Sequence, residues 1–278
     1  MSKSSYKNSL LQITLPTLTS FNEHHRELIE LAVNYSSISL IIHVSCKEIE
    51  FYSNYPTECW IKIRDLLNFL YISGTKVSYE NFKHFLEIDV IFEKWNGYNI
   101  ELVKEKIFDV FFGSEAEQSR LQEFNRTFDH LHAGHKILLT LTAWISGKRL
   151  ICGVTDDCML KEKKFKEYIE PINTRIAKVS KFLNAIHQNL LYEVVPIYDA
   201  YGPTITDPDI HALVVSKETV SGAELVNDER QKRGFGILEI FVIEVISSTN
   251  PSLEEVELKK LKLSSTYLRE LCKNSEAK

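Results

Sequence analysis

The C-terminal half of the chain alternates regularly between helix-like and strand-like hydrophobic patterns. Apolar residues recur at helical spacing in four segments, and short runs rich in Val, Ile and Leu indicate buried strands between them. The predicted helices are residues 133–146, 173–189, 222–234 and 264–273, and the predicted strands are residues 149–155, 191–197, 210–216 and 238–246. This alternation implies crossover connections and a parallel sheet covered by helices on both faces.

The N-terminal part has a more mixed pattern. Residues 25–35 and 59–73 have the spacing of helices, whereas residues 37–45 and 86–95 are rich in β-branched or aromatic side chains and indicate strands. No motif that carries chemistry is found there, and its polar residues are interpreted as solvated faces. We predict a small α/β accessory domain of unknown role, with partner binding as the working hypothesis.

The two patterns meet near residues 111–120, where small and charged residues interrupt the apolar spacing. We place a domain boundary there and predict one domain over residues 1–115 and a second over residues 116–278. A chain of 278 residues with 44% apolar composition is long enough to bury a sizeable core. The predicted fold class is α/β, with a Rossmann-like parallel sheet in the second domain.

Composition and charge argue against several classes of protein. The formal net charge of -5 gives no basic excess for binding nucleic acid. The five cysteines lack CxxC spacing, which is typical of free thiols in a reducing compartment. The N-terminus has no secretory signal, and no apolar run is long enough to cross a bilayer. We expect a cytoplasmic protein, with the nucleus left open, and neither a nucleic-acid nor a membrane partner.

Candidate chemistry is concentrated in the turns after the predicted strands, where a parallel sheet forms its ligand crevice. In the first turn, His132 and His135 flank Gly134 at the start of a predicted helix, with Thr127 and Asp129 just upstream. The first amides of a helix have no internal partner and carry partial positive charge, so this end can hold phosphate. Two histidines at this spacing could also be part of a zinc site. No third ligand is near them in the sequence, so we predict no metal ligands.

The second turn follows residues 149–155 and carries a run of lysines, with Arg175 on the next helix. A charge run is usually a solvated surface, and we interpret most of these lysines in that way. At least one of them is placed to reach a phosphate as a point charge. The lysines are Lys161, Lys163, Lys164 and Lys166.

The three remaining turns also contain residues suited to ligand binding. Residues 196–210 are rich in Gly, Pro, Thr and Asp, and form either a binding element or a rigid turn. The fourth turn and its helix offer Ser216, Glu218, Thr219, Asn227 and Arg230. The fifth places Ser264, Ser265 and Thr266 at a helix start, with Arg269 one turn later. A plain helix cap with a surface arginine explains the fifth turn equally well.

These motifs together carry a resemblance to a known family. HAGH in the first turn and SSTYLR in the last resemble the HxGH nucleotidyltransferase superfamily. Residues 202–234 look like the eukaryotic type of phosphopantetheine adenylyltransferase, the domain also found in bifunctional coenzyme A synthase. RLICGVT, EPINTR and KLSSTYLRE agree with the same family. The resemblance covers about residues 121–273, is strongest to the fungal stand-alone enzymes, and is weaker over the N-terminal part.

The resemblance implies that the second domain moves AMP from ATP to 4'-phosphopantetheine, which gives dephospho-coenzyme A and pyrophosphate in coenzyme A biosynthesis. Mg²⁺ is then expected on the ATP phosphates rather than in a protein cage. The resemblance also suggests other enzymes of the coenzyme A pathway as partners in a complex.

Site roles are carried over from the family residue by residue. His132 and His135 would bind the ATP phosphates, and His135 would stabilise the pentacovalent phosphorus. Thr127 would contact ATP and hold the phosphopantetheine phosphate, and Lys163 would bridge nucleophile and transition state. The triphosphate would be bound by Ser264, Ser265, Thr266 and Arg269. The substrate pocket would be shaped by Ser216, Glu218, Thr219, Asn227 and Arg230.

One departure from the family pattern affects the first turn. Asn125 and Arg126 stand where the family has two glycines, and arginine adopts a positive φ reluctantly. Either the turn is rebuilt or ATP binding is weakened. The alternative function is therefore a non-catalytic scaffold subunit of a coenzyme A-synthesising complex. Another superfamily member, such as a nicotinamide-mononucleotide or cytidylyl transferase, is disfavoured by residues 202–210 and 214–227.

Overall fold

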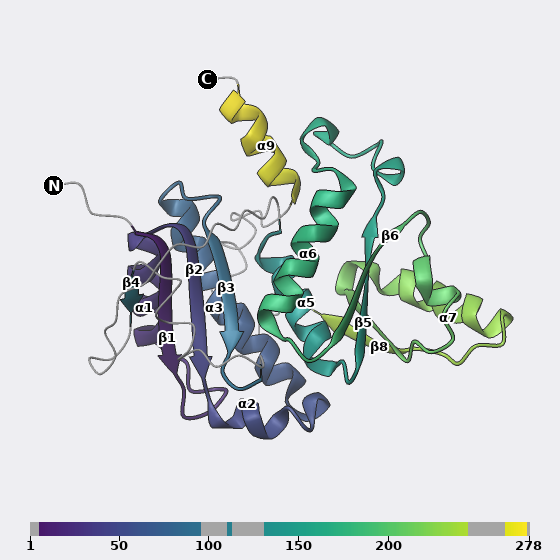
Figure 1. Ribbon diagram of the computed structural model, residues 1–278, viewed down its shortest axis with the longest axis horizontal. Helices are drawn as coiled ribbons and strands as arrows, with labels where there is room; N and C mark the ends of the chain where they lie inside the picture. Colours follow the sequence, from purple (N-terminus) through teal and green to yellow (C-terminus); the bar gives the residue numbers. More distant parts are fainter. Residues whose placement is uncertain (1–5, 96–109, 113–130, 244–264, 277–278) are drawn as a thin grey trace. The chain divides into compact units, whose positions relative to one another are not determined.

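The computed structural model describes residues 6–95, 110–112, 131–243 and 265–276, and the chain divides into two compact units (Figure 1). The first unit comprises residues 1–128, 143–145 and 182–190. The second unit comprises residues 129–142, 146–181 and 191–278. The first unit is thus discontinuous in sequence, because two short segments beyond residue 128 belong to it.

The first unit contains a four-stranded parallel sheet with the strand order β3-β2-β1-β4. Its strands are β1 (Tyr6–Thr14), β2 (Ser36–Ser45), β3 (Glu87–Phe92) and β4 (Val110–Phe112). In the central register, Leu10 of β1 lies opposite Ile41 of β2, and Ile42 of β2 lies opposite Val90 of β3. Leu10, Ile42 and Val90 are buried, so the middle of the sheet forms the core of this unit.

The helices of the first unit are α1 (Glu23–Tyr35), α2 (Lys47–Tyr52) and α3 (Trp60–Glu80), with a short 3₁₀ helix at Pro56–Cys59. A capping box between Asn22 and His25 fixes the start of α1, since each side chain bonds the backbone of the other residue. Helix α1 contacts β1 and β2, and α3 contacts β3 and α1 (Figure 1).

Strand β1 was not predicted from the sequence. Its polar residues Asn8, Ser9 and Gln12 interrupt the apolar run that marks a buried parallel strand. The structure nevertheless buries Asn8, and the Asn8 side-chain oxygen accepts a hydrogen bond of 2.9 Å from the Ser39 hydroxyl on β2. The polar residue is therefore satisfied by a neighbouring strand, which no local pattern reveals.

Aromatic side chains form a cluster in the first unit. The Trp144 and Trp95 rings lie 5.2 Å apart, and the Trp95 and His187 rings lie 4.7 Å apart. The Trp144 indole donates a 3.0 Å hydrogen bond to the Pro56 carbonyl. Because Trp144 and His187 come from residues 143–145 and 182–190, the first unit includes side chains from outside the predicted N-terminal domain.

The second unit contains two parallel strand pairs, β5 with β6 and β7 with β8. The strands are β5 (Arg149–Thr155), β6 (Leu191–Ile197), β7 (Ala212–Ser216) and β8 (Glu239–Ile243). The helices are α5 (Ala133–Ile145), α6 (Ile172–Ile186), α7 (Val220–Lys232) and α9 (Ser265–Glu276), the last residues of α5 and α6 belonging to the first unit. Short 3₁₀ helices lie at Asp157–Met159, Lys166–Tyr168, Gly202–Ile205 and Lys217–Thr219.

Every strand pair among the described residues is parallel, which confirms the predicted α/β class. The predicted helices and strands of the second half are all present, with small shifts at their ends. The strand predicted over residues 238–246 is described only as far as Ile243. Within the described ranges, none of the helices has the length and apolar character that a membrane span requires.

Candidate functional site

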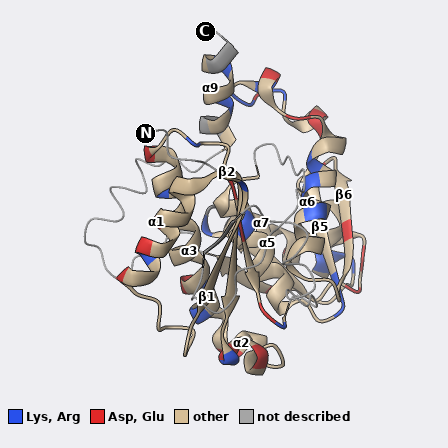
Figure 2. Cartoon of the chain, turned by 60° about the vertical axis from the view of Figure 1, so that its left-hand side comes forward, with Lys and Arg blue, Asp and Glu red and all other residues tan. Residues whose placement is uncertain are grey.

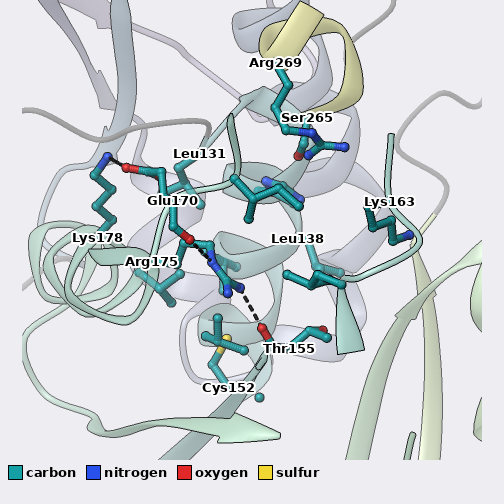
Figure 3. Close-up of a pocket in the computed structure, with 17 residues that line it drawn as sticks. Leu131, Leu138, Cys152, Thr155, Lys163, Glu170, Arg175, Lys178, Ser265 and Arg269 are labelled. Carbon is teal, nitrogen blue, oxygen red and sulfur yellow. Dashed lines mark hydrogen bonds and ion pairs between the residues drawn. The ribbon is translucent and has the colours of Figure 1, made fainter. Parts of the chain in front are cut away.

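A cavity of about 510 Å³ lies in the second unit (Figure 3). Its walls come from α5, β5, the turn after β5, α6 and α9. The apolar lining consists of Leu131, Leu138, Leu139, Val154, Leu160, Ile169 and Val179. The lining residues with reactive or polar side chains are His135, Cys152, Thr155, Lys163, Glu170, Arg175, Lys178, Ser265 and Arg269.

The two histidines of the first turn lie at the N-terminus of α5. The helix begins at Ala133, and the His132 carbonyl accepts its first hydrogen bond, from the Lys136 amide at 3.1 Å. The two imidazole rings stack with their centroids 3.8 Å apart. His135 lines the cavity, so the predicted placement of an imidazole beside helix-end amides is present in the structure.

The second turn brings one of its lysines to the cavity. All of these lysines are described and exposed, and Lys163 is the one that lines the cavity. The turn is held by backbone bonds, among them Lys163 N to Leu160 O at 3.0 Å. The interpretation of the other lysines as solvated agrees with their exposure.

The fifth turn meets the second one. Ser265 and Arg269 of α9 both line the cavity, and Arg269 is only 8% exposed (Figure 3). The Arg269 guanidinium donates to the Lys164 carbonyl at 3.2 Å, and Lys273 lies over the Phe165 ring at 5.2 Å. Burial lowers the pKa of Arg269 from its usual value, but a guanidinium remains charged at neutral pH.

The fourth turn does not contribute to the cavity lining. The fully buried Arg230 donates hydrogen bonds to five backbone carbonyls, those of Thr204, Asp207, Pro208, Ile210 and Gly236. Asn227 exchanges two hydrogen bonds with the backbone of Leu238, at 3.0 and 2.8 Å. Ser216 and Thr219 bond each other, with their hydroxyl oxygens 3.1 Å apart.

These contacts give Asn227 and Arg230 a structural role that their spacing in the sequence does not reveal. They hold the loop of residues 202–210 and the backbone of Leu238, directly before β8. The spacing of three residues was correctly interpreted as one helix face, but that face is directed at backbone carbonyls. Direct contact of these residues with substrate stays a prediction.

The charges around the cavity favour an anionic ligand. Lys163, Arg175, Lys178 and Arg269 supply four cations to its lining, and Glu170 supplies the one carboxylate among the lining residues. Lys178 forms a buried ion pair with Glu170. Basic positions lie along α6 and α9, coloured blue in Figure 2. Because Lys178 is paired with Glu170 and Arg175 with Asp157, a phosphate-bearing ligand would meet mainly Lys163, Arg269 and the amides of α5.

A model of the cytidylyltransferase-like family matches residues 124–271, more than half of the chain. The chain belongs to this family. It is 44% identical over 161 residues to the phosphopantetheine adenylyltransferase of Saccharomyces cerevisiae, covering 58% of this chain and 51% of that protein. An uncharacterized protein of Schizosaccharomyces pombe is 44% identical over 176 residues, covering 62% of this chain and 54% of that protein. The phosphopantetheine adenylyltransferase of Pyrobaculum aerophilum is 35% identical over 153 residues, covering 55% of this chain and 91% of that protein.

The family match includes the HAGH, EPINTR and SSTYLR motifs, so the resemblance drawn from them is confirmed. The chain spans only about half the length of the two fungal relatives. Membership of the cytidylyltransferase-like family therefore establishes the nucleotidyltransferase fold of the second half.

Several predicted site residues lie outside the described residues. They are Thr127, Ser264, the upstream Asp129 and the Asn125–Arg126 pair, together with the side chains of Glu218 and Thr266. Among the described residues, no group of three or more His, Cys, Asp or Glu side chains is arranged to hold a metal ion.

Among the polar or reactive lining residues, Cys152, Thr155, Glu170 and Lys178 were not singled out from the sequence. Glu170 and Lys178 are eight residues apart on either side of a helix start, where no local pairing rule applies. Cys152 belongs to the apolar run of β5, which indicates a buried strand and nothing more. Its burial raises the pKa of the thiol to about 11, so Cys152 stays protonated at neutral pH.

Proposed function

We propose that this chain is a phosphopantetheine adenylyltransferase, which transfers AMP from ATP to 4'-phosphopantetheine. The observation that carries the proposal is the meeting of His135, Lys163 and Arg269 on one cavity, from three turns far apart in sequence. The relatives with that name support it, including an archaeal enzyme that the chain matches over 91% of its length. The products are dephospho-coenzyme A and pyrophosphate.

The proposed reaction needs no covalent intermediate on the protein. A phosphate oxygen of 4'-phosphopantetheine attacks the α-phosphorus of ATP, and the bond from that phosphorus to the bridging oxygen breaks as pyrophosphate leaves. Catalysis then consists of holding the two reactants in line and neutralising the charge that develops on the phosphorus. A site of cations, imidazole and helix-end amides is suited to that task.

Four residues of the cavity lining have proposed roles in this reaction. His135 and the first amides of α5 stabilise the α-phosphate. His132 also binds the ATP phosphates, and its ring stacks on that of His135. Lys163 bridges the attacking phosphate and the α-phosphorus. Ser265 and Arg269 bind the leaving pyrophosphate from α9. The proposal extends to Thr127 and Ser264, which would complete the phosphate contacts.

Mg²⁺ is proposed as the divalent ion that accompanies ATP. Glu170, the one carboxylate in the cavity lining, is paired with Lys178, so the lining residues do not form a cage of oxygen ligands. This arrangement fits an ion that is held by phosphate oxygens and water. We further propose that the protein works in the cytoplasm, alongside other enzymes that make coenzyme A.

A non-catalytic scaffold is the second candidate. Asn125 and Arg126, in place of two family glycines, favour it. His135, Lys163 and Arg269 argue against it, because a scaffold has no need of cations and imidazole in one cavity. Transfer of a cytidylyl group is the third candidate, and the names of the relatives argue against it.

One assay separates these candidates. The full chain is incubated with Mg²⁺, 4'-phosphopantetheine and either ATP or CTP, and mass spectrometry measures dephospho-coenzyme A in the ATP reaction and its cytidine analogue in the CTP reaction. We expect product with ATP, little with CTP, and a loss of about 10²- to 10³-fold in kcat for His135→Ala. His211→Ala, which removes an exposed imidazole outside the cavity, should retain full activity.

Arg126→Gly completes the assay. If the natural chain is as inactive as His135→Ala while Arg126→Gly makes product, the scaffold is correct and the proposed activity of the natural chain is wrong.

A further inference from the structure

Lys163 lies on an irregular turn. The hydrogen bonds within that turn do not determine whether the Lys163 side chain is directed toward the cavity. After β5, the chain makes successive tight turns through Met159 N to Asp156 O, Leu160 N to Asp157 O and Lys163 N to Leu160 O, all at 3.0 to 3.1 Å. Such bonds set the local shape of the segment. Its orientation toward the cavity requires an anchor outside the turn.

Arg175 of α6 supplies that anchor. Its Nε donates to the Glu170 carbonyl at 2.8 Å, and one terminal nitrogen donates to the Thr155 carbonyl at 2.7 Å (Figure 3). The other terminal nitrogen forms an ion pair with Asp157. These acceptors mark three points of the segment. Thr155 is the last residue of β5, Asp157 is the second residue of the turn, and Glu170 lies just before α6.

The far side of the turn is held by α9. Arg269 donates to the Lys164 carbonyl, directly after Lys163, and Phe165 beside it adopts a left-handed φ of 56° under the Lys273 side chain. The segment that carries Lys163 is therefore fixed at its beginning by Arg175 and directly after Lys163 by α9.

We infer that Arg175 is a positioning residue, which acts on catalysis by holding Lys163 at the cavity. The inference rests on the proposed function, since it assigns Arg175 a task in that reaction. All three guanidinium nitrogens already bond the protein, and the Arg175 side chain is only 18% exposed. Arg175 lines the cavity wall as part of this anchor, and its effect on the reaction passes through Lys163.

The inference predicts a specific kinetic signature. If Lys163 acts mainly on the transition state, moving it lowers kcat and leaves the KM for ATP nearly unchanged. Arg175→Met should lower kcat about tenfold to a hundredfold, the range typical of a misplaced catalytic group. Arg175→Lys should restore little of the activity, because an ammonium group cannot reproduce the planar fork that reaches three acceptors.

A double-mutant cycle with Lys163→Ala tests whether the two residues act as one unit. In the Lys163→Ala background, Arg175→Met should change kcat by less than about twofold, because the group it positions is already gone. Full, additive loss in that background would overturn the inference and would indicate that Arg175 acts on the substrate directly. Arg233→Met is the matched control, because Arg233 also ties a loop to a helix, through Glu229 and Ile205, away from the cavity.

Trypsin digestion provides a readout that does not depend on activity. The lysines at 161, 163, 164 and 166 are exposed cleavage sites on the anchored segment. Arg175→Met and Arg175→Lys should both be cut there several times faster than the natural chain, while Arg233→Met should not. An inactive natural chain would refute the proposed function alone, because the digestion still tests the anchor.

If Arg175→Met does not fold, Arg175→Lys serves in both experiments. Wild-type kcat and wild-type resistance to trypsin in a folded Arg175→Lys variant would overturn the inference.

Discussion

Arg230 and Lys163 are both cationic residues in predicted turns, yet their surroundings give them different tasks. Arg230 is fully buried, and its donors are satisfied by five carbonyls. Lys163 is exposed and lines a cavity whose other charged residues are mostly cationic. The sequence predicts contact with a ligand for both, and only burial and partners separate a structural cation from one that lines a cavity.

Replacing Arg230 therefore tests the stability of the fold. Arg230→Met should lower the free energy of unfolding by at least about 3 kcal/mol, because several buried carbonyls lose their donor. Chemical denaturation monitored by circular dichroism measures this change. An Arg230→Met variant that is as stable as the natural chain but inactive would contradict the structural role. It would support the predicted contact of Arg230 with substrate.

At the scale of elements, the hydrophobic pattern predicted most helices and strands, because α5 and α6 have helical spacing and β5 and β6 are short apolar runs. The start of α5 and the fifth turn were also predictable, since helix-end chemistry is local. The Glu170–Lys178 pair and the Arg175 anchor were not, because their partners meet only after the chain has folded. Strand β1 was missed for a similar reason, because its buried Asn8 is paired with Ser39 of β2, a partner that only the folded chain brings near.

The loop that follows β6 is tied to β5 by a pH-sensitive contact. The Asp207 carboxylate accepts from the Asp209 amide at 2.9 Å and from Arg149 at 2.7 Å. The hydrogen bond from the Asp209 amide is the main reason that the pKa of Asp207 lies below its usual value. The hydrogen bond from Arg149 lowers the pKa further. Because the folded-state pKa is the lower one, the stabilisation is complete above the ordinary carboxyl pKa of about 4 and is lost as the pH falls through the folded-state value.

Thermal unfolding between pH 7 and pH 3 checks this contact. Asp207→Asn should have a lower Tm than the natural chain at pH 7, and the difference should shrink below about pH 4. A difference in Tm that does not vary with pH would mean that the charge of Asp207 contributes nothing.

At the scale of the whole molecule, the first unit requires residues that lie within the family domain. Trp144, Phe182 and Ile186 are at most 2% exposed, and all three belong to the first unit together with residues 1–128. The N-terminal part, which the sequence describes as an accessory domain, therefore does not contain its complete core. This arrangement could not be predicted from the sequence, because a hydrophobic stripe on a helix does not reveal which neighbour it contacts.

A fragment of residues 1–128 should accordingly be much less stable than the same region in the full chain. We expect weak near-ultraviolet circular dichroism and binding of a hydrophobic dye, since the fragment exposes the surface that Trp144 and Phe182 cover. A fragment with a cooperative unfolding transition and the stability of the full chain would contradict this.

The central claim is that the N-terminus of α5 and helix α9 bind the same nucleotide. Calorimetric titration with ATP and Mg²⁺ tests it most directly, using the natural chain, His135→Ala, Arg269→Met and the controls His211→Ala and Arg233→Met. We predict that His135→Ala and Arg269→Met each weaken ATP binding by about tenfold or more, while both controls bind as the natural chain does. Unchanged ATP affinity in folded His135→Ala and Arg269→Met proteins would contradict the claim.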